Sequence, residues 1–339
     1  MFRSVLISAC CVAMVLALGC KGEESNKSKG GQGATPEARK SEASSDKKLR
    51  IAVIPKGTTH VFWKSVEAGA KKAGVDLGVE IIWKGPLKEN DRDNQIRIVQ
   101  QFVSDGVSGI VLAPLDDTAL QGPVKSAMEK SIPVVIIDSA LKGEAGKDFV
   151  SFVATNNRKA GSIGGEQLAK LMGGKGKAVL LRYTVGSAST DEREIGFLEV
   201  MAKNPDINMI VKDRYGGATV GEAQKEAMNL LDKIKEANGI FCPNESSTFG
   251  MLLALRQNNL AGKIKFVGFD ATPLLVDALK KSEVEALVAQ DPTKMGYEGV
   301  KTLVAQLRGE KVPPAVDTGV ELITRDNLNT PAIQKLLAE

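Results

Sequence analysis

The sequence predicts an α/β protein built from two doubly wound parallel sheets that are joined by a multi-strand hinge. From residue 49 onward, short apolar runs alternate with segments of helical spacing, the pattern of β-α-β units. The first strand-like run is apolar almost throughout, as a strand buried on both faces should be. The alternation starts again at residue 157, and a length of 339 residues fits two domains of roughly 100–200 residues each.

The first half begins with the apolar run 49–55, which is predicted to be a buried strand. Further strands are expected at 79–83, 109–113 and 133–138, and helices at 62–77, 91–104 and 118–130. The second half repeats the pattern. Its strands are expected at 178–183, 209–212, 239–243, 264–269 and 284–290, and its helices at 157–172, 190–203, 220–235, 248–258, 272–280 and 292–307.

The segment before residue 49 is predicted to be processed rather than folded. An apolar run over 5–18 follows Arg3 and is short for a membrane span, which needs about 20 residues. It ends in LALGC, which resembles a bacterial lipobox. The expectation is a signal peptide over 1–19 and a lipid on Cys20; the alternative is a secretory signal with incidental cysteines. Because 21–48 holds no Leu, Ile, Val, Phe, Trp or Tyr, 20–48 should be a disordered tether.

Composition and motifs argue against several functional classes. The net charge of +4 is concentrated in the first 48 residues, which leaves 37 basic against 36 acidic residues in the rest and no basic stripe for nucleic acid. Nucleophile-elbow, phosphate-loop and dinucleotide-binding motifs are absent, so an enzyme is not expected. With a single histidine, no His-rich metal site is predicted, and no cofactor is expected. Cys242 lies in an apolar run and is expected to be buried.

Aromatic residues gather just after the first predicted strand. Phe62, Trp63 and the only histidine, His60, occur together in a chain with only 4% aromatic residues. Ligands of open parallel sheets bind beyond the carboxyl ends of the strands, so this segment is a candidate binding loop. Trp63 has a competing interpretation, because Trp63, Val66 and Ala70 share helical spacing and indicate a core stripe. For His60 the alternative is a solvent-exposed turn.

Six stretches make the sequence resemble the ribose-type family of periplasmic sugar-binding proteins, which have the type I fold and serve ABC importers. Each lies at the end of a predicted strand or the start of a predicted helix. The resemblance covers about residues 49–325. The stretches are 62–70 (FWKSVEAGA), 133–138 (PVVIID), 192–197 (EREIGF), 243–245 (PNE), 267–273 (VGFDATP) and 289–290 (AQ).

The resemblance implies a sugar site between two domains. Phe62 and Trp63 would stack on the sugar ring, and His60 stands where the family often has Asn. Hydrogen bonds to sugar hydroxyls would come from Asp138, Arg193, Asn244, Asp270 and Gln290. The alternative for these polar residues is a helix N-cap or a surface pair. Tyr215 is a possible aromatic contact from the second domain.

Two features depart from the ribose-binding pattern. Ser139, which is also a candidate ligand residue, follows Asp138 where ribose binders have Arg, so one strong donor is missing. The segments around Lys56 and 84–86 resemble the autoinducer-2 and rhamnose-type members instead, which makes Lys56 and Asp191 further candidate ligand residues. These departures argue against plain D-ribose and still favour a small polyhydroxylated ligand.

The resemblance also implies an organisation and a function. The N-terminal domain should comprise 49–154 plus 291–319, and the C-terminal domain 155–290 plus 320–339. The expected function is a lipid-anchored periplasmic or cell-surface protein that delivers a monosaccharide or related polyol to an ABC permease. The alternative is a sensor for chemotaxis or signalling. A lactose-repressor-type regulator is disfavoured, because a leader and tether occupy the place of a DNA-binding segment.

Overall fold

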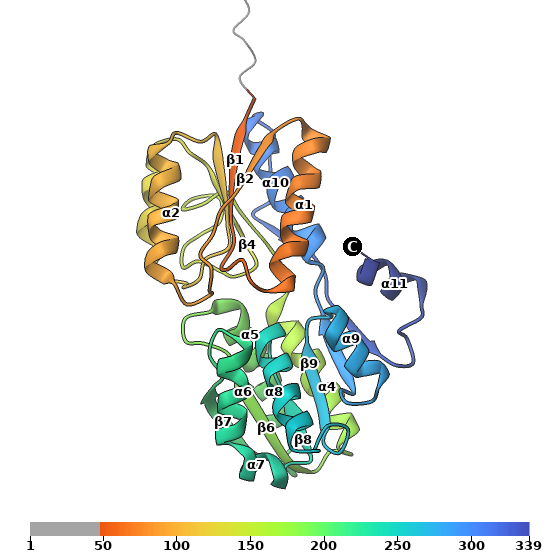
Figure 1. Ribbon diagram of the computed structural model, residues 1–339. Helices are drawn as coiled ribbons and strands as arrows, with labels where there is room; N and C mark the ends of the chain where they lie inside the picture. The colour runs from red at the N-terminus through yellow and green to blue at the C-terminus, as the bar shows by residue number, and fades with distance from the viewer. Residues whose placement is uncertain (1–47, 339) are drawn as a thin grey trace, which may run out of the picture. The chain divides into compact units, whose positions relative to one another are not determined.

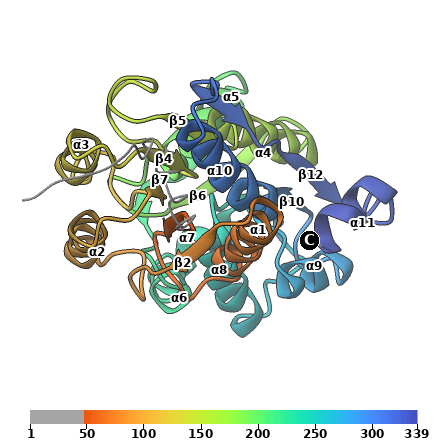
Figure 2. The same cartoon turned by 90° about the horizontal axis from the view of Figure 1, so that it is seen from above.

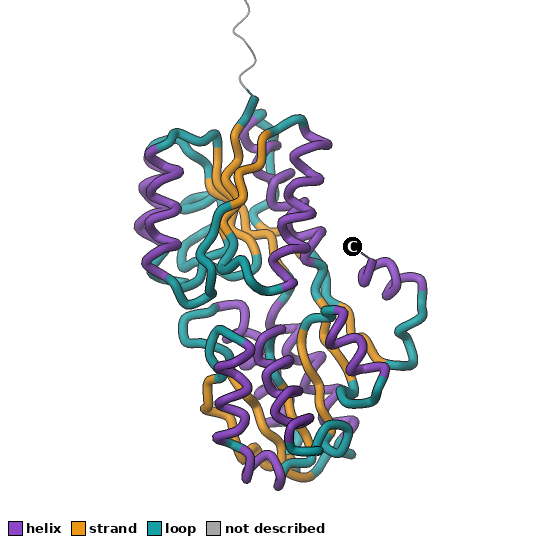
Figure 3. The backbone as a smooth tube through the Cα atoms, in the orientation of Figure 1, coloured by secondary structure: helices purple, strands orange, loops and turns teal. Residues whose placement is uncertain are grey.

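Two six-stranded sheets with helices on both faces organise residues 48–338, the part of the chain that this computed structural model describes (Figures 1 and 3). Neighbouring strands run parallel throughout, except that the last strand pairs antiparallel to its neighbour. The predicted fold class is therefore confirmed.

The first sheet and its covering helices form what we term lobe 1. The strand order is β11-β5-β4-β3-β1-β2. The strands are β1 (Arg50–Ile54), β2 (Glu80–Trp83), β3 (Gly109–Leu112), β4 (Val134–Ile137), β5 (Ser151–Ala154) and β11 (Ala315–Asp317); the helices are α1 (Val61–Leu77), α2 (Arg92–Ser104), α3 (Gln121–Glu129) and α10 (Pro292–Leu307).

The second sheet and its helices form lobe 2, with the strand order β12-β10-β9-β8-β6-β7. The strands are β6 (Gly176–Arg182), β7 (Ile207–Tyr215), β8 (Gly239–Phe241), β9 (Lys265–Phe269), β10 (Ala286–Ala289) and β12 (Glu321–Thr324). The helices are α4 (Asn157–Leu171), α5 (Ala188–Ala202), α6 (Val220–Asn229), α7 (Leu231–Glu236), α8 (Glu245–Gln257), α9 (Pro273–Lys280) and α11 (Pro331–Ala338). The chain passes between the lobes after β5, after β10 and after β11.

The central strands explain why the sheets are covered on both faces. Every residue of β3, β4 and β10 is buried, so both faces of these strands need an apolar layer. Each lobe accordingly has two apolar clusters, one on each face of its sheet. Burial of one Val, Leu or Ile side chain stabilises the fold by roughly 1.5–3 kcal/mol.

Glycines let one pair of helices in each lobe approach very closely. Helices α1 and α10 lie side by side in lobe 1 (Figures 1 and 2). A Cβ on Gly69 would lie 1.9 Å from the carbonyl oxygen of Thr293, and one on Gly296 would lie 2.0 Å from that of Val66. In lobe 2, a Cβ on Gly161 of α4 would lie 1.9 Å from the carbonyl oxygen of Arg193 on α5. These crossings admit no side chain.

Several element boundaries differ from the expectation. The helix predicted over 220–235 is two helices, α6 and α7, which meet at Leu230. Helix α8 begins at Glu245 rather than at 248, because the side chain of Asn244 accepts a hydrogen bond from the backbone N–H of Ser247 and caps the helix there. Strands β5, β11 and β12 and helix α11 were not expected as elements.

The expected leader, tether and lipid site fall largely outside the described residues. The signal peptide over 1–19, Cys20 and the tether up to 47 belong to the part of the chain for which no structure is given. None of the helices between residues 48 and 338 is long and apolar enough to cross a membrane.

Candidate functional site

A small cavity of about 30 Å³ collects side chains that follow strands of both sheets. This volume is far below the range for small-molecule pockets, about 300–1,000 Å³, so the two lobes leave little free space between them in this structure. Of the predicted site residues, all except Ser139 and Asp191 line it. The lining comprises Lys56, His60, Phe62, Trp63, Glu89 and Asp138 from lobe 1, and Tyr183, Ser189, Thr190, Arg193, Asn244, Glu245, Asp270 and Gln290 from lobe 2 and its connection to α10.

The aromatic pair lies at the start of α1 and borders the cavity. The ring centroids of Phe62 and Trp63 are 5.0 Å apart, and the rings are nearly perpendicular. Both rings also pack into the core beside Val66, so each ring contributes to the core and to the lining of the cavity. The indole N–H of Trp63 donates to Oε1 of Glu89 over 2.7 Å, which fixes the orientation of the ring.

Lys56 bridges the two lobes. Its Nζ lies 2.8 Å from Oδ2 of Asp138 in lobe 1, and it donates to Oγ of Ser189 over 2.9 Å and to Oγ of Ser187 over 3.4 Å in lobe 2. An ammonium group has three N–H donors, so these partners account for all of them. Lys56 therefore holds Asp138 in place and joins the lobes, although it was predicted as a ligand residue.

Asp138 and Asp270 occupy corresponding places in the two lobes. Asp138 follows β4 and Asp270 follows β9, and both have left-handed backbone conformations, with φ of 63° and 67°. Asp tolerates this conformation better than most residues, but it still costs energy. The carboxylate of Asp270 accepts hydrogen bonds from the backbone N–H of Glu245 and from Nε2 of Gln290, both over 2.8 Å. Burial raises the pKa of Asp270, and the charge of Arg193 opposes this shift.

Arg193 projects from α5 into the cavity with only 2% of its surface exposed. It donates to Oδ1 of Asn157 over 2.8 Å, to the carbonyl oxygen of Pro243 over 3.0 Å and to Oε1 of Gln290 over 2.7 Å. The guanidinium also lies 4.0 Å from the ring centroid of Phe269. A guanidinium has five N–H groups, so two more are left to serve a ligand. Burial lowers the pKa of Arg193, but the group stays charged.

Three predicted residues serve other purposes. The side chain of Asn244 caps α8 and donates to Oγ of Ser246 over 3.1 Å, although it also borders the cavity. Oγ of Ser139 accepts a hydrogen bond from the backbone N–H of Ser189 over 3.0 Å. Asp191 lies in the first turn of α5, 3.6 Å from Arg182, and burial raises its pKa. Ser139 and Asp191 are therefore not brought to the cavity.

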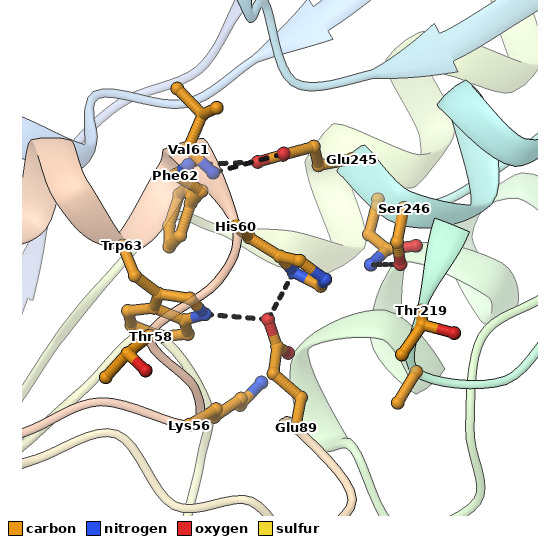
Figure 4. Close-up of polar contacts among 12 residues, drawn as sticks. Lys56, Thr58, His60, Val61, Phe62, Trp63, Glu89, Thr219, Glu245 and Ser246 are labelled. Carbon is orange, nitrogen blue, oxygen red and sulfur yellow. Dashed lines mark hydrogen bonds and ion pairs between the residues drawn. The ribbon is translucent and has the colours of Figure 1, made fainter. Parts of the chain in front are cut away.

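Glu89 lies in the loop after β2 and was missed by the sequence analysis. Its carboxylate accepts hydrogen bonds from Trp63 and Tyr183 and pairs with Nδ1 of His60 at 2.5 Å (Figure 4). Burial alone would raise the pKa of Glu89, but the charge and hydrogen bond of His60, the charge of Lys56 and the hydrogen bond from Trp63 lower it to about 2. Burial alone would lower the pKa of His60, but Glu89 raises it to about 9. The two side chains therefore form an ion pair at neutral pH. The signal that could have found Glu89 is its place after the strand expected at 79–83, where ligands of parallel sheets bind.

Glu245 was also missed, and it joins the lobes. Its two carboxylate oxygens accept hydrogen bonds from the backbone N–H groups of Val61, over 3.1 Å, and Phe62, over 2.9 Å (Figure 4). These N–H groups open α1, where the helix dipole favours a negative charge. A carboxylate of lobe 2 thus caps a helix of lobe 1.

The aromatic residue of lobe 2 that borders the cavity is Tyr183, at the end of β6. Its side chain is 1% exposed, and its hydroxyl donates to Oε2 of Glu89 over 2.9 Å. Burial raises its pKa, so the hydroxyl stays protonated. Tyr215, the residue considered from the sequence, lies outside the cavity and packs under the guanidinium of Arg182 at 4.7 Å.

Comparison with known proteins agrees with two α/β lobes around a polar cavity. A periplasmic binding protein domain is recognised over residues 51–311. The chain belongs to the periplasmic binding protein family. This membership confirms the resemblance seen in the sequence. The match begins in β1 and ends just after α10, so it includes every cavity residue of this periplasmic binding protein.

Relatives of this periplasmic binding protein include characterised sugar binders. It is 30% identical over 292 residues to the D-ribose/D-allose-binding protein of Pseudomonas aeruginosa, which covers 83% of this chain and 91% of that protein. A solute-binding protein of Agrobacterium radiobacter, solved with D-arabinose, is 35% identical with a TM-score of 0.82, covering 86% of this chain and all of the other. A protein of Agrobacterium vitis, solved with D-fucose, is 34% identical with the same TM-score, covering 85% and 99%.

Proposed function

We propose that this chain is the sugar-binding component of an ABC-type importer, and that one small monosaccharide or related polyol binds between the lobes. The observation that carries the proposal is the composition of the cavity. An aromatic pair borders it beside two strand-end carboxylates, Asp138 and Asp270, and the guanidinium of Arg193. Carboxylates accept hydrogen bonds from hydroxyls, Arg donates to them, and the apolar face of a sugar ring suits an aromatic ring. The relatives named above bind ribose, allose, arabinose and fucose.

Ligand capture would work by closure of lobe 1 on lobe 2, the two domains of the molecule. A ligand that touches both lobes favours the closed state by its differential affinity. The connections after β5, β10 and β11 would act as the hinge, with large changes in φ and ψ confined to them. A membrane permease driven by a cytoplasmic ATPase would then recognise the closed form.

A thermal-shift screen tests the proposal. The purified protein is unfolded and refolded to remove any bound sugar, then mixed with D-ribose, D-allose, D-arabinose, D-fucose and other small sugars and polyols. A ligand that binds only the folded state stabilises it by about 2.7 kcal/mol at 100 times its Kd. We expect one of these compounds to raise the Tm in this way.

Arginine variants locate the binding. Arg193→Ala should abolish the shift because it removes the buried donors of the cavity. The matched control is Arg158→Ala, which removes only exposed ion pairs with Glu192 and Glu199 and should keep the shift. No shift with any compound, or equal shifts in the two variants, would contradict the proposal.

We also propose that Cys20 carries a lipid after removal of residues 1–19, which would hold the protein at the periplasmic or cell surface of a membrane. The LALGC sequence supports this, and the polar segment 21–48 would serve as the tether. Cys20→Ser should release the protein from membranes and abolish labelling by a fatty acid analogue. Unchanged membrane association of this variant would argue against the anchor.

The sensor alternative, with an autoinducer-2-like or rhamnose-like ligand, is less well supported by the site. The resemblance to the autoinducer-2 and rhamnose-type members, which suggests such a ligand, makes Lys56 and Asp191 ligand residues. The three donors of Lys56 are directed to Asp138, Ser187 and Ser189, and Asp191 lies outside the cavity. We therefore do not adopt it.

A further inference from the structure

Glu89 organises side chains from both lobes although it lies in a connecting loop. It is 7% exposed and follows β2. Oε1 accepts from the indole N–H of Trp63 and contacts Nδ1 of His60, while Oε2 accepts from the hydroxyl of Tyr183 in lobe 2. Figure 4 shows the imidazole of His60 and the indole of Trp63 both directed at the same carboxylate oxygen. One carboxylate therefore sets the position of three side chains that line the cavity.

The bond to Glu89 leaves the other nitrogen of His60 available. Nδ1 is directed at the carboxylate, and within residues 48–338 no hydrogen bond is found for Nε2. His60 borders the cavity, so Nε2 is the atom of this ring that can meet a ligand. A neutral imidazole that donates from Nδ1 would present only a lone pair there, whereas a charged imidazole presents an N–H.

The surrounding charges favour the charged imidazole. Glu245 of α8 and Asp270 after β9 face His60 in addition to Glu89. On the other side, Glu89 is faced by Lys56 from the β1–α1 loop and by Tyr183, which directly follows β6. Three carboxylates thus act on His60, and the nearby cation, Lys56, has its own partner in Asp138.

We propose that Glu89 is a positioning residue of the sugar site, which holds His60 as a cation so that its Nε2–H donates to a sugar oxygen. The inference rests on the proposed function and deepens it, since it assigns a charged donor from lobe 1 to the ligand. The raised pKa of His60, about 9, agrees with this arrangement.

The chain has a single histidine, which makes the charge of His60 directly measurable. Proton NMR of the imidazole ring reports only this residue. In the wild-type protein the ring should stay charged through pH 8 and titrate near pH 9. In Glu89→Gln, which keeps the size and one acceptor of the side chain, the titration should move to about pH 6.5 or below, the ordinary range of a histidine.

Sugar affinity over the same pH range tests the donated hydrogen bond. The sugar is the compound that gives the largest thermal shift, and its Kd is measured by calorimetry between pH 5.5 and 8. Wild-type affinity should be constant. The affinity of Glu89→Gln should fall by about tenfold as His60 loses its proton, because a hydrogen bond from a charged donor is lost. Tyr183→Phe removes another partner of Glu89 but leaves the charge of His60, so it should show no such pH dependence.

Each part of the proposal can fail separately. An unchanged His60 titration in Glu89→Gln would show that Glu89 does not hold the charge. A shifted titration with the same pH profile of affinity as the wild-type protein would show that Nε2–H is not a sugar donor. Either result overturns the inference while sugar binding itself stands. A wild-type protein that binds no sugar would instead overturn the proposed function.

Discussion

Ionisable side chains in the cavity form many of their hydrogen bonds and ion pairs with other protein groups. Lys56 pairs with Asp138, and His60 pairs with Glu89. Arg193 is held by Asn157, Pro243 and Gln290. A buried charge without a partner is very unfavourable, so a site that must stay polar without ligand needs such internal partners. The ligand is therefore expected to meet the remaining N–H groups and lone pairs of an assembled network.

The His60–Glu89 pair should make stability depend on pH. The pKa of His60 is raised from 6.5 to about 9, so its contribution is complete below pH 6.5 and is lost as the pH rises through 9. The pKa of Glu89 is lowered from 4.5 to about 2, so its contribution is present above pH 4.5 and is lost as the pH falls through 2. The two shifts describe one interaction, worth roughly 3 kcal/mol, which is complete between about pH 4.5 and 6.5.

Calorimetry at two pH values measures this contribution. Glu89→Gln should lower the Tm most near pH 6, and the difference from the wild-type protein should shrink towards pH 10. Glu236→Gln is the control, because its pair with Lys177 is exposed and screened by solvent, so this substitution should change the Tm little at either pH. A difference that stays constant from pH 6 to pH 10 would mean that Glu89 acts through packing and hydrogen bonds alone.

The crossing of α4 and α5 connects helix packing to the site. Gly161 of α4 lies against the backbone of Arg193, whose side chain enters the cavity. Gly161→Ala must push the helices apart, since a Cβ would lie 1.9 Å from the carbonyl oxygen of Arg193. We expect a loss of about 1–3 kcal/mol in the free energy of unfolding, measured with urea, and weaker sugar binding.

A second glycine provides the matched control for this prediction. Gly221 lies near the start of α6 in the same lobe, and a Cβ there would have no atom within 4 Å. Gly221→Ala should leave affinity unchanged and stabilise the protein by up to about 1 kcal/mol. Equal effects of the two substitutions would show that close helix approach does not position Arg193.

Strands and helices with a buried apolar face could be predicted from the sequence, whereas short exposed strands at the edge of a sheet could not. Strands β3 and β4 are runs of wholly buried residues, which the periodicity identifies directly. By contrast, β11 has three residues, two of them exposed, and it forms by adding to the edge of a sheet built earlier in the chain. Its partner lies more than 150 residues away in sequence, so local pattern does not reveal it.

The same distinction applies to the candidate site. The rule that ligands meet the carboxyl ends of parallel strands brought attention to Asp138, Arg193 and Asp270, which line one cavity. Glu89 resembles an ordinary charged residue of a polar turn, and only its three partners in space distinguish it. Likewise, nothing local to Lys56 predicts that its donors reach the serines of the other lobe.

Direct contacts between protein groups join the two lobes around the cavity. Glu245 caps α1, Lys56 reaches Ser187 and Ser189, and Tyr183 donates to Glu89. These bonds need no ligand, so they lower the free energy of the closed state by themselves. A larger fraction of the molecules is then closed before ligand binds, so less of the binding free energy is needed for closure. The apparent affinity for the ligand therefore depends on these contacts.

Glu245 offers a test of this contribution. Glu245→Gln removes the negative charge at the start of α1, which is worth about 0.3–2 kcal/mol. Small-angle X-ray scattering should give a larger radius of gyration for the ligand-free variant than for the ligand-free wild-type protein. With saturating sugar, the radii of gyration of the variant and the wild-type protein should be equal. The affinity of the variant for the sugar should be a few-fold weaker.

An exposed carboxylate supplies the control for closure. Glu144→Gln in lobe 1 affects only an exposed pair with Lys147 and should change neither the radius of gyration nor the affinity. Scattering curves and affinities of Glu245→Gln that match the wild-type protein would mean that this cap does not contribute to closure.

Lobe 1 is completed by segments that come late in the chain. Helix α10 covers the face of the first sheet beside α1, and β11 adds the last strand at its edge. Both lie beyond residue 290, after nearly all of lobe 2. During synthesis from the N-terminus, the first 150 residues therefore emerge without the partners that would bury their apolar face. The order of segments along the chain therefore delays completion of the N-terminal lobe until the residues beyond 290 are available.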